Sequence, residues 1–264
     1  MIAPLPPDER DPIRDAETAL ANLVATYEAI GLALEGAFRF DGEGYRGVLS
    51  AIQHGAGNFA LVRNPGPRAA RELAAIAGER PELFIYLLPS ATGDSDAAAA
   101  ESLRRAGFRL FAVQAVMARP AIPLELHRRS RMVEATGISP RIELMDFLTK
   151  QFFEYHPREF RMHLAVATAR AEVCRLFEIR DRRLRVAGAM TTELQGAYGL
   201  YDLAVRDGYR GAGLGRELLN DLLSNIPERT RLVTLQCLRP LIPWYERAGF
   251  APVGEMATFV RDEG

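Results

Sequence analysis

The residues with the clearest chemical potential form the run GYRGAGLGREL, positions 208–218. Three glycines alternate there, at 211, 213 and 215, between the strand-like segment YDLAV and a run with leucines on one helical face. A helix start exposes unpaired N–H groups and the positive end of the helix dipole, and glycine lets an anion approach the backbone closely. The pattern therefore predicts a phosphate or pyrophosphate site, to which Arg210 and Arg216 would add positive charge.

The alternative interpretation of this run is a glycine-rich turn that only connects a strand to a helix. Glycine inside a helix costs roughly 1 kcal/mol relative to alanine, so three of them favour a compensating ligand. The run lacks the GK[ST] ending of a nucleotide-binding P-loop. The next strand, TRLVTLQCL, has no acidic residue at its end for a dinucleotide ribose.

Three motifs in order make the segment 141–261 resemble the GNAT-type N-acetyltransferase superfamily. RGAGLG fits the signature R-x-x-G-x-G with Arg210, Gly213 and Gly215, YDLAV precedes it, and WYERAGFAPVGE follows one strand later. The resemblance implies acetyl-CoA as cosubstrate and direct attack of an amine on the thioester. No metal is expected, because neither cysteine has a Cys or His neighbour at metal-ligand spacing.

The resemblance also implies where the cofactor lies. The backbone at Leu203, Ala204 and Val205 would pair with the pantetheine arm. The strands at 203–205 and 232–238 would splay apart to admit that arm. The pyrophosphate would be cradled by the N–H groups of six consecutive residues: Gly211, Ala212, Gly213, Leu214, Gly215 and Arg216.

Direct transfer needs a proton donor for the leaving thiolate and a base for the amine. By the resemblance, Tyr245 in PWYERAGF is the general acid, and a phenol is close enough in pKa to a thiol for proton transfer. Core packing beside Trp244 is the alternative role for this tyrosine.

The sequence does not single out one residue as the general base. The positions where family members often carry Glu or His hold Gly199 and Tyr201, which departs from the pattern. Three residues stay open as the base or a substrate-facing group: Glu193, Tyr201 and Asp202. Strand alternation points Asp202 to the opposite face unless a β-bulge intervenes. A water chain or an amine that is already neutral would also serve.

The run QFFEYHPREFRMH, between two expected helices, lies where the superfamily's acceptor site usually is. Phe152, Phe153, Tyr155 and His156 are the candidate acceptor-binding residues, and ordinary core packing of these aromatic side chains is the alternative. Neither His156 nor His163 has a second ligand at metal spacing.

Elements of alternating type along the chain predict an α/β fold (an α+β mixed sheet) flanked by helices. In the first half, helices are expected at 14–36, 67–80 and 96–107, with strands at 37–52, 59–64, 82–90 and 108–119. In the second half, helices are expected at 142–155, 158–172, 213–226 and 243–249, with strands at 173–180, 184–195, 197–205, 232–238 and 250–261.

An internal echo predicts two related halves. LRRAGFRLFAVQAVMAR (103–119) and YERAGFAPVGEMATFVR (245–261) share Arg, Ala, Gly, Phe, Ala and Arg in register, each with a helix that closes on glycine before a strand. We therefore expect tandem GNAT-like modules, each a twisted, mostly antiparallel sheet. A degenerate module spans 1–120, a connecting segment 121–140, and the acetyl-CoA-binding module 141–264.

Two details support a degenerate first module. Leu103 replaces Tyr245 in the echo, and in direct alignment Leu49 and Ala51 replace the loop glycines. The early GYRG at 44–47 is expected to be a strand turn that shares its letters by chance.

Bulk composition limits the classes of partner. The chain has 264 residues with a net charge of −1, which gives no support for a nucleic-acid partner. No apolar run reaches the roughly 18 residues of a membrane span. The N-terminus lacks a signal-peptide pattern, and Cys174 and Cys237 are expected to be buried thiols, so we expect a cytoplasmic protein.

The predicted function is transfer of an acetyl group from acetyl-CoA to a primary amine of a small molecule or peptide, with a homodimer as an open possibility. One alternative is a non-catalytic acyl-CoA-binding sensor or structural protein. The other is an acyltransferase with a longer acyl donor or a hydroxyl acceptor.

Overall fold

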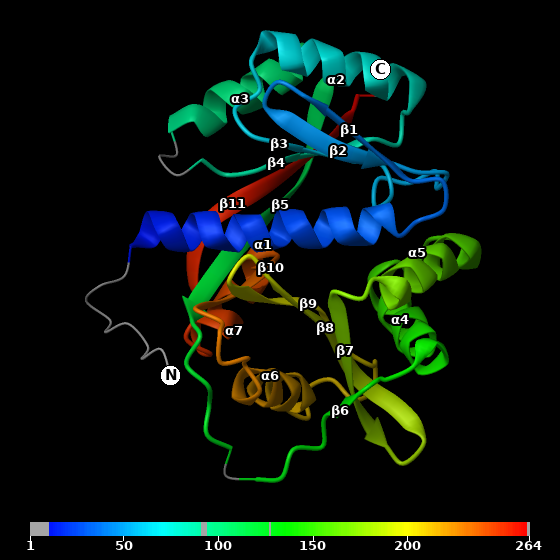
Figure 1. The fold of residues 1–264 in the computed structure, drawn as a ribbon, viewed down its shortest axis with the longest axis vertical. Coiled ribbons are helices and arrows are strands. Elements are labelled where there is room, and N and C mark those ends of the chain that lie inside the picture. The colour runs from blue at the N-terminus through cyan, green and yellow to red at the C-terminus, as the bar shows by residue number, and fades with distance from the viewer. Residues whose placement is uncertain (1–10, 91–93, 127, 263–264) are drawn as a thin grey trace.

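The computed structural model describes residues 11–90, 94–126 and 128–262. Within these residues, eleven strands form one mixed sheet in the order β1-β2-β3-β4-β11-β5-β10-β9-β8-β7-β6 (Figure 1). The strands are β1 (Phe38–Gly42), β2 (Tyr45–Leu49), β3 (Phe59–Val62), β4 (Phe84–Leu87), β5 (Phe108–Pro120), β6 (Val133–Glu134), β7 (Cys174–Asp181), β8 (Leu184–Leu194), β9 (Ala197–Val205), β10 (Leu232–Cys237) and β11 (Ala251–Arg261).

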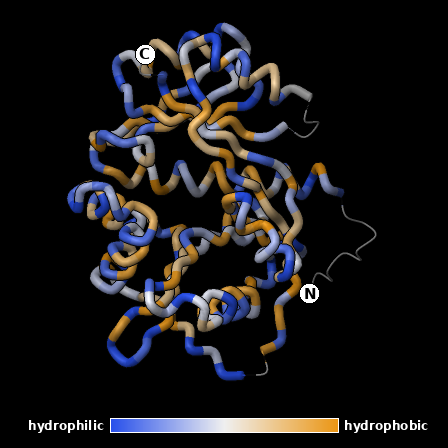
Figure 2. Tube along the Cα trace, turned by 180° about the vertical axis from the view of Figure 1, so that it is seen from behind, coloured by the Kyte–Doolittle hydropathy of each residue, from blue (hydrophilic) through white to orange (hydrophobic). Residues whose placement is uncertain are grey.

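Helices cover both faces of this sheet. They are α1 (Pro12–Leu32), α2 (Pro67–Glu79), α3 (Asp94–Arg105), α4 (Ile138–Phe152), α5 (Arg158–Arg170), α6 (Leu214–Ser224) and α7 (Ile242–Glu246), with a short 3-10 turn at Arg239–Leu241. Figure 2 shows hydrophobic residues concentrated along the strands and hydrophilic residues on the outer turns. None of the helices in the described ranges is both long and apolar enough to cross a bilayer.

Alternation along the strands shows which of the helices share a face of the sheet. On β4, Ile85 and Leu87 pack in the cluster with α2 and α3, whereas Tyr86 packs in the cluster with α1. On β10, Val233 and Leu235 pack against α6. Helices α2, α3 and α6 therefore share one face, and α1 crosses the other face through the middle of the molecule (Figure 1). We call the latter the α1 face.

Helix α1 begins with a strong N-cap. The Asp11 carboxylate accepts the N–H groups of Ile13 and Arg14, and Pro12 occupies the first helical position. Farther along, Asn22 donates from its amide to the carbonyl oxygens of Leu194 and Ala197, both at 3.0 Å. The first helix of the chain is thereby fixed onto the β8–β9 hairpin of the second half.

The two halves exchange their last strands. Strand β11 lies between β4 and β5, and β5 lies between β11 and β10. Their long antiparallel pairing joins Phe108 to Arg261 at one end and Ala118 to Ala251 at the other. Each half thus inserts its final strand into the sheet of the other. The two similar segments, 103–119 and 245–261, are related by a pseudo-two-fold axis between β5 and β11.

The tandem arrangement expected from the echo is confirmed, and both helix-closing glycines adopt positive φ, 88° at Gly107 and 85° at Gly249. The early GYRG is a hairpin turn, with Gly44 at φ 78° before β2. The sequence did not show that the two sheets join into one. In space, the expected modules 1–120 and 141–264 are therefore interlocked, since β11 belongs among the strands of the first.

The connecting segment is shorter than expected, because α4 begins at Ile138, inside the expected range 121–140. It contains one short strand, β6. Both cysteines, Cys174 and Cys237, are free and buried, which confirms the prediction of buried thiols.

Candidate functional site

The site begins where two parallel strands separate. Strands β9 and β10 pair from Ala197 opposite Leu232 to Leu200 opposite Leu235, and the pairing stops there although β9 continues to Val205. On its other side β9 stays paired with β8 up to Val205. The β10-facing edge of residues 201–205 therefore offers unpaired backbone groups, and the splay expected from the sequence is present.

The glycine loop leads from this open edge into α6. Gly211 and Gly213 both have φ of 82°, and Gly213 is the N-cap, whose carbonyl accepts the N–H of Glu217 at 2.9 Å. None of the N–H groups of residues 211–216 donates a hydrogen bond to another described residue. Such a row of free N–H groups at a helix start suits an anion.

The third glycine is not required by internal packing. A Cβ at Gly215 would meet Val205 Cγ2 at 3.5 Å and Trp244 at 3.8 Å, which are ordinary contacts. The nearby Arg210 is exposed, donates from Nε to the Val205 carbonyl at 3.2 Å, and pairs with Asp207 at 3.0 Å. Arg216 is exposed as well. The loop thus leaves open space where the pyrophosphate was expected.

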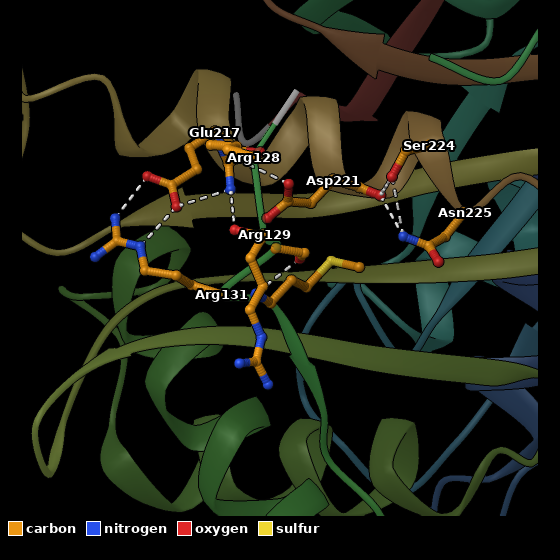
Figure 3. Close-up of polar contacts among 9 residues, drawn as sticks. Arg128, Arg129, Arg131, Glu217, Asp221, Ser224 and Asn225 are labelled. Atoms are coloured by element: carbon orange, nitrogen blue, oxygen red, sulfur yellow. Dashed lines mark hydrogen bonds and ion pairs between the residues drawn. The ribbon is translucent and has the colours of Figure 1, made fainter. Parts of the chain in front are cut away.

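A segment of the connecting chain fastens α6 from outside (Figure 3). Arg131 makes two hydrogen bonds to the Glu217 carboxylate, at 2.7 and 2.6 Å, and lowers the pKa of that carboxyl. Arg128 donates to the fully buried Asp221 at 2.8 Å. These two arginines were not anticipated from the sequence, because nothing in the local pattern links the connecting segment to α6.

Tyr245 lies on the α6 face of the gap. It is buried, with its ring 4.7 Å from Trp244 and 5.8 Å from Phe250. Burial raises the pKa of its hydroxyl to about 12, with a smaller contribution from Cys237 on β10. That hydroxyl makes no hydrogen bond to another described residue. The phenol is therefore neutral and lies beside the gap, but its raised pKa moves it farther from that of a thiol, about 8.5, than the sequence predicted. Its role as general acid stays a prediction.

Asp202 lies on the opposite, α1 face because β9 bulges there. Met190 of β8 opposes Tyr201 while Gly188 opposes Ala204, which leaves Asp202 in the bulge with φ of 51°. The sequence predicted that Asp202 could face the substrate only if the strand contained a β-bulge, and the structure has that bulge. Burial raises the pKa of its carboxyl to about 6. A base that titrates near neutrality is suited to accept a proton from an amine.

The other two base candidates have different surroundings. The Tyr201 hydroxyl is buried and donates to Asn22 Oδ1 at 2.7 Å, in a position that anchors α1. A Cβ at Gly199 would collide with the same amide oxygen, so α1 leaves no room for a side chain at this position, where the family resemblance implies Glu or His. Glu193 is exposed opposite Tyr198, near the β8–β9 turn.

Comparison with known proteins agrees with this geometry. Residues 172–252 match the acetyltransferase (GNAT) domain family. This segment contains the splayed strands, the glycine loop and Tyr245. The second half of the chain contains a GNAT domain. The match supports the enzyme class expected from the sequence, an acyltransferase. No curated protein matches the sequence.

Solved structures share the whole architecture. A GCN5-related N-acetyltransferase from Kribbella flavida has a TM-score of 0.65 at 14% identity, over 95% of this chain and 96% of that chain. A tandem GNAT protein from the clavulanic acid biosynthesis pathway has 0.58 at 14%, over 99% and 98%. A GCN5-related N-acetyltransferase from Sphaerobacter thermophilus has 0.56 at 17%, over 95% and 93%. At these identities the likeness shows the tandem GNAT fold.

The expected acceptor residues of the GNAT domain divide into two groups. Phe152 and Tyr155 are exposed, the latter at 95%. Phe153 and His156 are partly buried and meet the first half: His156 Nε2 lies 3.0 Å from His54 Nε2, and Phe153 lies 5.8 Å from the His54 ring. No group of three or more metal-ligating side chains occurs among the described residues.

The first half has its own strand-to-helix loop at the place equivalent to the glycine loop. It runs from Arg63 to Gly66, between β3 and α2. It is only half as long as the 206–213 loop, and β3 stays paired with β4 along its whole length, up to Val62 opposite Leu87. The structural counterpart is therefore this loop, which corrects the direct alignment with Leu49 and Ala51. The first half lacks both the splay and the long loop.

Proposed function

We propose that the chain is an N-acetyltransferase that transfers an acetyl group from acetyl-CoA to a primary amine. The observation that carries the proposal is the open edge of β9 that leads directly to the free N–H groups of residues 211–216. The pantetheine arm would pair with Leu203 to Val205, and the pyrophosphate would bind to the loop. A reducing cytoplasm suits the two free thiols.

Two residues, one on each side of the opening between β9 and β10, carry out the two proton transfers. Asp202, on the α1 face, accepts a proton from the ammonium form of the acceptor. The amine nitrogen then bonds to the acetyl carbonyl carbon, the bond from that carbon to sulfur breaks, and the acylated nitrogen releases its second proton to solvent. Tyr245, on the α6 face, gives its proton to the leaving thiolate and regains one from solvent. The products are an acetamide and free CoA.

Cofactor binding is tested with Gly215→Glu, because the space beside Gly215 accepts a side chain without steric conflict in the protein. A carboxylate there would repel the pyrophosphate, so we expect calorimetric affinity for acetyl-CoA to fall at least about a hundredfold. Gly66→Glu, at the equivalent loop of the first half, is the matched control and is expected to change nothing. Unchanged affinity in Gly215→Glu would refute this binding mode.

Catalysis is tested with Tyr245→Phe. We expect thiol release in an amine screen to slow by about 10²–10⁴ in kcat, while acetyl-CoA affinity stays within twofold, since only the proton donor is lost. Acetyl-CoA binding without thiol release from any amine would favour the non-catalytic sensor. Tighter binding of longer acyl-CoA would favour the longer donor.

A further inference from the structure

A series of aromatic side chains from the first half leads away from the proposed base. Tyr27 of α1 packs against the cluster that contains Tyr201 and Ala204, on either side of Asp202 in β9. Burial, and to a smaller extent the charge of Asp202, raises the pKa of Tyr27. The Tyr27 ring is 5.3 Å from that of Tyr86 on β4, which is 6.2 Å from Phe84. Phe84 in turn lies 5.6 Å from the His54 ring. The series ends at the α4–α5 loop, where His54 contacts Phe153 and His156.

These side chains border the α1 face and are not sealed in the core. Ile85 and Leu87 of β4 are buried under α2 and α3, so Phe84 and Tyr86 point the other way. Tyr27, Phe84 and Tyr86 all keep part of their surface exposed, unlike the neighbouring Phe59, which is buried. An aromatic ring of a ligand that contacts these partly exposed rings would gain the same edge-to-face or offset-stacked contacts that they make with one another.

Polar groups are placed at one end of this series. The hydroxyls of Tyr27 and Tyr86 make no hydrogen bond to another described residue. The amide nitrogen of Gln236, on β10 and also on the α1 face, is buried without a partner in the described structure. Asp202 is the charged group at this end, whereas the nearby carboxylate of Glu28 on α1 is already paired with Arg46 of β2 at 2.9 Å. A ligand that fits has a cationic end at Asp202 and an apolar body along the rings.

We propose that Tyr27, Phe84 and Tyr86 form the acceptor site of the GNAT domain, and that the acceptor is a primary amine with a planar, apolar body. This inference rests on the proposed acetyl transfer, and it assigns to the first half a direct role in substrate choice. An acceptor that carries carboxylates or phosphates is disfavoured, because the nearby Arg46 is already paired with Glu28.

The test compares acceptors with the wild-type protein first. With 2-phenylethylamine and ethanolamine as probes, we expect kcat/KM for the aromatic amine to be higher by about tenfold or more, from stacking and burial of its ring. A preference for ethanolamine, or none, would overturn the inference while leaving acetyl transfer intact. Absence of acetyl-CoA binding would instead refute the proposed function.

A substitution tests whether the Tyr86 ring causes the preference for the aromatic amine. Tyr86→Leu keeps an apolar side chain but removes the ring, so we expect KM for 2-phenylethylamine to rise about fivefold to tenfold while KM for ethanolamine and acetyl-CoA affinity stay within twofold. Phe38→Leu, at an exposed ring on β1, is the matched control. If Tyr86→Leu lowers thermal stability, binding of 2-phenylethylamine to the wild type by saturation-transfer NMR, with signals of Tyr27 and Tyr86 perturbed, decides the matter; no perturbation of either ring refutes the site.

Discussion

Asp202 shows how one backbone irregularity changes the chemistry of a residue. In a regular strand its side chain would alternate with that of Tyr201, but the bulge holds it at φ of 51° and turns it to the α1 face. Burial there raises the pKa of its carboxyl to about 6. The same residue is thus a suitable base and a source of local instability, since its charged form is poorly solvated.

The pH dependence of Asp202 gives a residue-scale prediction for activity. If Asp202 is the base, kcat/KM should rise with pH below about 6 and level off above it, because the carboxylate must be deprotonated. Asp202→Asn should lower kcat by about 10²–10⁴ and remove this step from the pH profile. Glu193→Gln is the control for the exposed alternative, and a loss of the step in that variant would assign the base to Glu193.

Stability should respond to the same substitution with a defined sign. The folded state binds the Asp202 proton more tightly than the unfolded chain does, so the stability of the folded state decreases as pH rises from about 4 to about 6. Asparagine removes this penalty and tolerates positive φ. At pH 8 we expect Asp202→Asn to raise the free energy of unfolding by about 2 kcal/mol in urea denaturation, and to leave it unchanged near pH 3. An equal effect at both pH values would contradict the titration argument.

At the scale of elements, α6 carries a negative charge that would repel an anion bound at the loop proposed for the pyrophosphate. Glu217 lies in the first turn of the helix, and Arg131 of the connecting segment neutralises it through two hydrogen bonds (Figure 3). The connecting segment therefore does more than join the halves. It sets the charge at the helix start, where an anion would bind.

Arg131→Ala tests this electrostatic role. With Glu217 left only its longer ion pair to Arg128, at 3.4 Å, we expect acetyl-CoA affinity to fall about threefold to tenfold, with a smaller loss at 0.5 M salt because the interaction is screened. The double variant Arg131→Ala/Glu217→Gln should restore affinity, since the repelling charge is gone. Stability should change by less than about 1 kcal/mol, because the Arg131 side chain is half exposed and Glu217 keeps its ion pair with Arg128. Failure of the double variant to restore binding would show that Arg131 acts otherwise.

At the scale of the whole molecule, strand exchange makes the two halves depend on each other. Strand β11 has both of its neighbours, β4 and β5, in the first half, and β10 pairs with β5 on one edge. The second half alone would therefore lack the partners of one strand entirely and of another on one edge. Unpaired strand edges and the exposed apolar surface between them are not stable in water.

We therefore expect residues 121–264, produced alone, to lack a fixed fold. The measurement is the dispersion of backbone amide signals in a two-dimensional NMR spectrum, which should become native-like only when residues 1–120 are added. The full chain should unfold in one transition, because neither half retains a complete sheet. A dispersed spectrum from the isolated second half would contradict the interlocked arrangement.

The sequence by itself determined the features that depend on neighbours in the chain. Alternating glycines before a leucine face predicted the loop and α6, and the echo of 103–119 in 245–261 predicted tandem halves, because caps, turns and periodicity are local properties. The resemblance to GNAT proteins rested on the same local motifs, and it predicted that strands β9 and β10 separate.

Tertiary structure decided the rest. The bulge at Asp202 depends on the register between β8 and β9, and the exchange of β5 and β11 depends on pairing between distant strands. The approach of Tyr27 to Asp202 and of Arg131 to Glu217 likewise joins elements far apart in the chain. A local pattern specifies which face of an element is apolar but not which partner covers it, so these contacts appear only when the sheet is assembled.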